Sequence, residues 1–254
     1  MIMTNILNKD EIKLIKISGR ILKESLDAVI SAVKPGVSTL RLDEIAYHAI
    51  KERGAEPSFK DYEVKGSGLF PSTLCVSVNE EVVHGLPSLR VLKEGDVVSL
   101  DIGAGYKGVY TDMAVTIPVG KVSPKATKLI ETTRKCLLIG INQAFAGCRI
   151  GDIGHAVQEY AEGQGFGVVR DLVGHGIGRE PHMSPHIPNF GKKNSGPVIM
   201  EGMALAIEPM LTEGGYDVQV EADGWTITTF DGSLSAHFEH TVVILNGKPV
   251  IVTA

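Results

Sequence analysis

The feature that most constrains the fold of this chain is an internal repeat. Two short stretches recur in the same order in its two halves, and each copy carries one carboxylate at a matching position. The pairs are "EGDVVSLDI" (94–102) with "EGMALAIEP" (201–209), carrying Asp101 and Glu208, and "DMAVTI" (112–117) with "EHTVVI" (239–244), carrying Asp112 and Glu239. This repeat predicts two halves of similar plan whose acids meet where the halves join.

The helical segments between these stretches repeat as well. Asp43 lies eleven residues before Gly54, and Asp152 lies eleven residues before Gly163. We therefore expect a pseudo-twofold α/β fold in a single domain of 254 residues. Its two αβ halves run over about 10–120 and 124–254.

Hydrophobic periodicity and turn residues divide the chain into elements. Helices are predicted over 10–33, 39–53, 123–146 and 152–162, and strands over 73–78, 96–102 and 111–117. Between the last two strands, "DIGAGYKGVYTD" reads as a β-hairpin because glycines interrupt it and β-forming residues flank it.

The hairpin raises an electrostatic problem. If its turn centres between Tyr106 and Lys107, antiparallel pairing puts Asp101 directly opposite Asp112. Like charges in directly opposed positions are destabilising. Because the flanking strands are apolar enough to be buried, the pair requires a shared proton or a cation.

Four carboxylates that converge in a buried centre repel one another unless metal neutralises them. "LVGHGIGREPHMSP" adds an imidazole, His175, among glycines that let the backbone approach closely. Four acids and one histidine suit two ions better than one, and oxygen-rich ligation favours Mn, Fe(II) or Co over structural zinc. Two ions that activate a bridging water imply metal-assisted hydrolysis.

Composition narrows the setting. A net charge of −5 argues against a nucleic-acid-binding footprint, which is usually basic. Three cysteines without C-x-x-C spacing (Cys75, Cys136 and Cys148) argue against a disulfide framework or a thiolate zinc site. Because the chain has neither a signal-peptide pattern nor an apolar run of about 20 residues, we expect a soluble cytoplasmic protein.

The five metal-site residues and their flanks, "GHGIGR", "AIEPM" and "SLSAHFEHT", resemble the motifs of the type I methionine aminopeptidases in their short bacterial form. The resemblance covers essentially the whole chain. It implies the pita-bread fold, in which two pseudo-twofold-related αβ halves surround a central antiparallel sheet. It also implies removal of the N-terminal methionine from nascent polypeptides, two divalent ions (Co, Mn, Fe(II) or Zn), docking at the ribosome and a monomeric state.

The resemblance further implies roles for individual residues. Asp101 would hold one ion, Asp112 and Glu239 would bridge both, and His175 with Glu208 would hold the other. Glu208 would also act as general acid and base. His84 and His182 match the two histidines that contact the scissile peptide and stabilise its oxyanion. Phe70, Cys75 and Trp225 match positions of the methionine pocket.

The remaining histidines are expected to be structural. His48 and His155 fall in predicted helices, and His186 and His237 in loops or at the surface. His240 follows Glu239 on a strand, so alternation points it away from the metals.

Some pocket positions depart from the family pattern. In "KGSGLFP", Ser67 and Gly68 stand where tyrosine and histidine are common, and Pro181 and Met183 flank the second catalytic histidine in place of a bulky apolar residue and a glutamate. The expected result is a hydrolase whose pocket lacks part of its aromatic wall. Two alternatives remain: an X-Pro dipeptidase or aminopeptidase P of the same fold, and a non-catalytic pita-bread binding protein.

Overall fold

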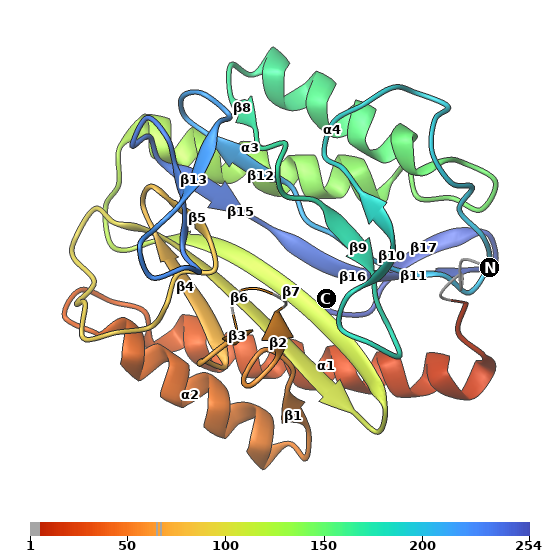
Figure 1. Cartoon of the computed structure of the whole chain (residues 1–254), viewed down its shortest axis with the longest axis horizontal. Coiled ribbons are helices and arrows are strands. Elements are labelled where there is room, and N and C mark those ends of the chain that lie inside the picture. Colours follow the sequence, from red (N-terminus) through yellow and green to blue (C-terminus); the bar gives the residue numbers. More distant parts are fainter. Residues whose placement is uncertain (1–5, 65, 67) are drawn as a thin grey trace.

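The computed structural model describes residues 6–64, 66 and 68–254, and its centre is one large antiparallel sheet (Figure 1). The strand order is β1-β6-β7-β16-β11-β9-β10, with β4 also paired to β6 and β17 to β16. These strands are β1 (Glu56–Pro57), β4 (Leu74–Val78), β6 (Val97–Tyr106), β7 (Val109–Pro118), β9 (Gly174–Gly176), β10 (Met183–Ile187), β11 (Ala204–Ile207), β16 (Glu239–Leu245) and β17 (Lys248–Ile251). The sheet therefore takes strands from both halves of the chain.

The described part of the chain also forms three smaller sheets. One contains β15 (Ser235–His237), β12 (Met210–Thr212) and β8 (Gly167–Val168). Another contains β13 (Val218–Val220), β14 (Ile227–Thr229) and β5 (Glu81–Val83). The third is a short hairpin of β2 (Glu63–Val64) and β3 (Gly68–Leu69).

Four helices carry the repeat seen in the sequence. They are α1 (Lys9–Ala32), α2 (Thr39–Glu52), α3 (Pro124–Ile141) and α4 (Ile150–Gly163). In Figure 1, α1 and α2 lie below the strands, whereas α3 and α4 lie above them. Each half thus contributes one helix pair.

The caps of these helices explain their first residues. Asn8 caps α1 in a capping box with Glu11, and the hydroxyls of Ser38 and Ser123 cap α2 and α3. The predicted end of α3 near residue 146 is wrong. Asn142 ends the helix, and the chain then turns back on itself through short-range bonds such as Phe145 N to Gln143 O.

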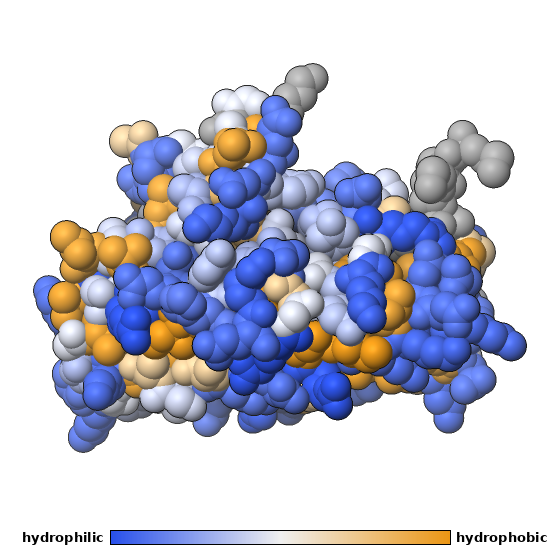
Figure 2. Space-filling view, turned by 90° about the horizontal axis from the view of Figure 1, so that it is seen from below, coloured by the Kyte–Doolittle hydropathy of each residue, from blue (hydrophilic) through white to orange (hydrophobic). Residues whose placement is uncertain are grey.

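The helices bury one face against the sheet. Leu22 and Leu26 of α1 pack with Leu42 of α2 against β4 and β6, and Leu137 of α3 packs with Ile153 of α4 against β11 and β16. The outer faces are polar: hydrophilic residues cover most of the surface seen from below in Figure 2, on the side of α1 and α2. Among the described residues, the helices are too short or too polar to cross a membrane.

The two halves join at the pairing of β7 with β16. Glu239 pairs with Ala114 and His240 with Met113. Thr241 Oγ1 strengthens the junction, since it accepts a hydrogen bond from Asp112 N and donates one to Asp112 O, each at 2.8 Å. This junction places the acids of the repeat beside one another.

Candidate metal centre

The hairpin of β6 and β7 has a different register from the one that the sequence suggested. Asp101 pairs with Ala114, and Asp112 pairs with Gly103. The turn residues are Lys107 and Gly108, with φ of +49° and +84°, so the turn centres one residue later than expected. When the turn centre moves by one residue, each residue of β6 pairs with a residue of β7 two positions further along the chain, so Asp101 pairs with Ala114 instead of Asp112.

The prediction that the two aspartates lie directly opposite each other is therefore wrong. Their side chains nevertheless lie on the same face of the sheet. A shift of two residues preserves the side of the sheet on which a side chain lies, because side chains alternate with a period of two. Asp101 and Asp112 are diagonal neighbours, a relation in which side chains still reach each other.

A row of residues crosses four strands of the sheet at this point. Cys75 pairs with Asp101, Asp101 with Ala114, and Ala114 with Glu239. The small side chain of Ala114 leaves space between the two acids. A carboxylate oxygen from each of Asp101, Asp112 and Glu239 lies within 4.8 Å of the others.

His175 approaches the acids from the second half. It lies in β9, which is held between β10 and β11. A Cβ at Gly174 would clash with Ala206 O, and one at Gly176 would clash with Ser184 O. The glycines of "GHG" are therefore required by close packing of three strands, and the Gly176 carbonyl lies 2.9 Å from His175 Nδ1.

Glu208 follows β11 directly and completes the group. Its Oε1 lies 3.5 Å from His175 Nε2. One ligand atom from each of His175, Glu208 and Glu239 lies within 4.8 Å of the others. The structure thus brings together all five residues that the sequence assigned to metal binding.

One histidine in this region lies where it was not expected. His237, expected in a loop or at the surface, is only 1% exposed, and its Nε2 lies 3.6 Å from Glu208 Oε2. The sequence does contain a sign of this position. His237 lies two residues before Glu239 in a strand-like stretch, and alternation along a strand puts both side chains on the same side. Of the other histidines, His240 points away as predicted and contacts Thr253 Oγ1 at 2.9 Å.

Electrostatics of the centre are unfavourable for bare carboxylates. Burial raises the pKa of Asp101 to about 6 and that of Glu208 to about 8. Burial, followed by repulsion from neighbouring acids, raises the pKa values of Asp112 and Glu239 well above their ordinary range. Burial also lowers the pKa of His175 to about 3, so its ring is a neutral nitrogen donor.

The donor set fits divalent cations. Asp101 Oδ1, Asp112 Oδ1 and Glu239 Oε1 are buried and have no hydrogen-bond partner within the described parts of the chain. Buried polar atoms are normally satisfied, so three neighbouring carboxylate oxygens without a hydrogen-bond partner fit a site that binds a positively charged ligand. Carboxylate oxygens with one imidazole are the donors that Mn and Fe(II) accept.

A cavity of about 570 Å³ opens over these residues. Phe70, Cys75 and Trp225, the pocket residues expected from the sequence, line it together with His84 and His182. The Phe70 and Trp225 rings meet edge to face with centroids 5.1 Å apart. His84 has φ of +58°, a conformation rare outside glycine that is often found at functional sites.

Among the described residues, the cavity wall contains more aromatic side chains than the sequence suggested. Phe59 and Tyr62 also line the cavity, with Phe59 6.4 Å from the Phe70 ring and Tyr62 5.2 Å from the His182 ring. Neither residue was expected at the cavity, because both precede the segment just before Phe70 in which the family pattern has its aromatic residues. Ser67 lies outside the described residues. Gly68 lies in β3, Pro181 is buried, and Met183 begins β10.

Comparison with known proteins supports the same picture. The model of metallopeptidase family M24 matches residues 13–246. The chain is 47% identical to the methionine aminopeptidase of Clostridium acetobutylicum over 247 residues, which is 97% of each protein. The crystal structure of methionine aminopeptidase from Thermotoga maritima has a TM-score of 0.95, 44% identity and 99% coverage of both chains.

Similarity to an X-Pro enzyme is weaker. The Xaa-Pro dipeptidase of Bacillus anthracis has a TM-score of 0.78 at 24% identity, and the match covers 98% of this chain but 62% of the dipeptidase. That likeness shows the shared fold alone. Together the comparisons confirm the expected pita-bread architecture. From its fold and its relatives, the chain belongs to metallopeptidase family M24.

Proposed function

We propose that this protein is a metal-dependent methionine aminopeptidase that removes the N-terminal methionine from polypeptides. The observation that carries the proposal is the cluster of Asp101, Asp112, His175, Glu208 and Glu239 at the floor of an aromatic-walled cavity. Relatives with 47% identity over nearly the whole chain bear that name. Such a cavity can bind a peptide whose first side chain is long and apolar, with the peptide bond next to the metal ligands.

Two divalent ions are proposed for the cluster. Asp101 would hold one, Asp112 and Glu239 would bridge both, and His175 with Glu208 would hold the other. Two overlapping groups of donors that share Glu239 support two ions over one. When bound, such ions lower the pKa of water toward about 7 and polarise a peptide carbonyl. Mn, Fe(II), Co and Zn are the candidate metals.

Glu208 is the proposed proton carrier. Cations beside a carboxyl group favour its ionised form, so Glu208, whose pKa is about 8 without metal, would be ionised in the metal-loaded protein and would accept the proton that the attacking water loses. The protonated carboxyl then donates to the amine that leaves when the peptide bond breaks. His237 Nε2 lies 3.6 Å from Glu208 Oε2, slightly beyond hydrogen-bond distance.

His84 and His182 are proposed to stabilise the oxyanion. Desolvation, then the neighbouring imidazoles of His237 and His182, lower the pKa of His84 to about 4, so the ring is neutral near pH 7 and donates through one N–H. His182 lies at the cavity with its ring centroid 4.5 Å from that of His175. Donors placed where charge develops lower the barrier of acyl transfer.

The methionine pocket is proposed to consist of Phe59, Phe70, Cys75 and Trp225, with Tyr62 beside His182. Contact between a thioether and aromatic rings adds to the burial of the side chain. Because Phe59, Tyr62, Phe70 and Trp225 line the cavity, we expect a preference for methionine as the first residue.

The natural substrates, the site of action and the oligomeric state are also proposed from the family. Substrates would be nascent chains met at the ribosome by a monomeric enzyme. The proposed location is the cytoplasm, and the three free cysteines of the chain are compatible with its reducing environment.

The test is methionine release from Met-Ala-Ser with Mn, Fe(II) or Co, with Gly-Pro as a competing substrate. Asp112→Asn should lower kcat/KM by about 100-fold or more, because a bridging oxygen donor is lost. Asp27→Asn is the matched control, since Asp27 is an exposed partner of Lys23 on α1. Equal loss in both variants, or cleavage of Gly-Pro in preference to Met-Ala-Ser, would contradict the assignment, and no release at all would favour a binding protein.

A further inference from the structure

An apolar row leads from the interior of the cavity to its mouth. In the sheet of β5, β14 and β13, Val83 pairs with Ile227, and Ile227 pairs with Val220. All three line the cavity. Val83 is 4% exposed whereas Val220 is 63% exposed, so the row continues from the buried core into solvent.

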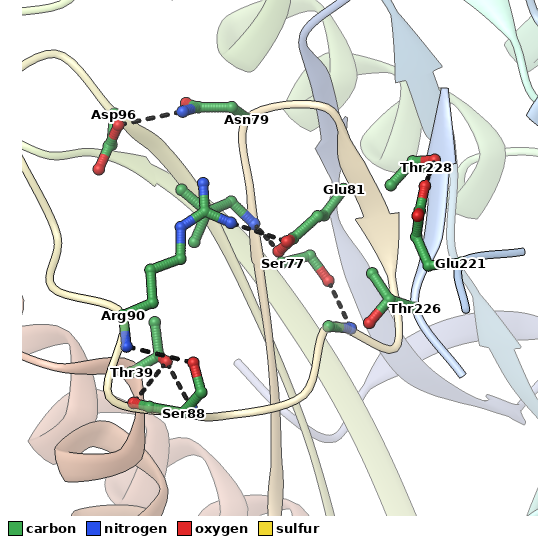
Figure 3. A network of polar contacts seen from close by, with 12 residues as sticks. Thr39, Ser77, Asn79, Glu81, Ser88, Arg90, Asp96, Glu221, Thr226 and Thr228 are labelled. Carbon is green, nitrogen blue, oxygen red and sulfur yellow. Dashed lines mark hydrogen bonds and ion pairs between the residues drawn. The ribbon is translucent and has the colours of Figure 1, made fainter. Parts of the chain in front are cut away.

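On β14 and β13 the opposite face of the sheet is polar, which holds the row in place, whereas on β5 the neighbour of Val83 is the buried, apolar Val82. Thr226, Thr228 and Glu221 alternate with the row, and Thr228 Oγ1 donates to Glu221 Oε1 at 2.7 Å (Figure 3). The side chains of the row therefore cannot turn away from the cavity without reversing this face.

A second exposed valine lines the cavity from a separate hairpin. Val64 of β2 is 37% exposed. Single exposed apolar residues are ordinary on protein surfaces. Here, however, Val64 and Val220 come from different sheets and border the same opening, and a bound chain would bury both.

We propose that this row and Val64 form a subsite for an apolar side chain on the third residue of the substrate. The inference rests on the proposed function, which places the scissile bond at His84, next to Val83. In an extended chain the third residue lies about 5 Å beyond the bond between residues one and two, and its side chain points to the same side as that of the first. Neighbouring strands are about 4.8 Å apart, so that side chain reaches Ile227 and Val220.

The experiment compares two nearly isosteric peptides, Met-Ala-Leu and Met-Ala-Asn, on the metal-loaded full chain. We expect kcat/KM for the leucine peptide to be about fivefold higher, mainly through KM, because only leucine gains from leaving water. Val220→Ser should reduce this ratio to below about twofold, and Val64→Ser should reduce it partly. Val91→Ser is the matched control, because Val91 is 45% exposed and lies outside this cavity.

The outcomes are separable. Equal kcat/KM for the two peptides, or the same ratio in Val220→Ser and Val91→Ser, would overturn the subsite while leaving the proposed function intact. Failure to release methionine from both peptides would overturn the proposed function and the subsite with it.

Discussion

At the scale of single residues, small side chains make the centre possible. Ala114 separates Asp101 from Glu239 in the row that crosses the sheet, and Gly176 allows β10 to approach β9. The charged residues are the candidate metal ligands, and the small residues leave the space in which those ligands come together.

Gly176→Ala tests this dependence. The added methyl would meet the Ser184 carbonyl oxygen, so we expect a loss of about 1–3 kcal/mol in the free energy of unfolding, together with weaker metal binding at His175. Chemical denaturation and titration with Mn measure the two effects. Gly163→Ala is the control: its methyl meets nothing within 4 Å at the end of α4, and stability should be unchanged or rise by up to about 1 kcal/mol. Similar losses in both variants would contradict the close-packing argument.

At the scale of elements, the "GHGIGR" segment links the metal centre to the first helix. Arg179 follows β9 and contacts both carboxylate oxygens of Glu11, at 2.6 and 2.7 Å. The same glutamate accepts a hydrogen bond from Asn8 N in the cap of α1. The N-terminus of α1 is therefore tied to the strand that carries His175.

Arg179→Lys should weaken this link. A lysine cannot reproduce the two-pronged contact, and we expect a loss of about 1 kcal/mol in the free energy of unfolding. Lys13→Ala, which removes a highly exposed ion pair with Asp10, should reduce the free energy of unfolding far less. Thermal melting curves of the two variants, measured in parallel, test this difference. An equal shift of the midpoint temperature would mean that the contact between Arg179 and Glu11 is an ordinary surface ion pair.

At the scale of the whole molecule, the two halves meet at the metal centre, and each supplies part of it. Asp101 and Asp112 come from the first half, and His175, Glu208 and Glu239 from the second. We propose that the halves form a single catalytic domain that folds as one unit. Repulsion among the gathered carboxylates then lowers the free energy of unfolding of the whole domain, by an amount that depends on bound metal and on pH.

The metal-free protein should accordingly lose stability as pH rises. Asp101 and Glu208 have folded pKa values of about 6 and about 8, above their ordinary values of 3.8 and 4.5. The folded state therefore binds more protons than the unfolded state between about pH 4 and 8, so the free energy of unfolding falls with pH across that window.

Thermal melts in chelator from pH 5 to 8 measure this effect. We expect one transition whose midpoint falls with pH, and Mn should raise the midpoint most at pH 8. Glu208→Gln should make the decline above pH 6 shallower, because it removes one of the buried carboxyl groups that ionise there. A midpoint that is constant across the range would contradict the buried-carboxylate argument, and two separate transitions would contradict the single domain.

Much of this protein could be predicted from its sequence because the decisive signals are local. Repeated carboxylates on strand-like stretches, glycines around His175 and capped amphipathic helices depend on neighbours within a few residues. Those patterns predicted the architecture and the five residues that the structure brings together.

Only the tertiary structure decided what depends on contacts between distant segments. The register of β6 with β7, the burial of His237 beside Glu208, and the placement of Phe59 and Tyr62 at the cavity wall are all of this kind. A turn displaced by one residue kept both aspartates on one face, since side chains alternate along a strand, but it changed which residues pair. The sequence by itself therefore determined the chemistry of the centre, and long-range packing determined its geometry and the shape of the cavity above it.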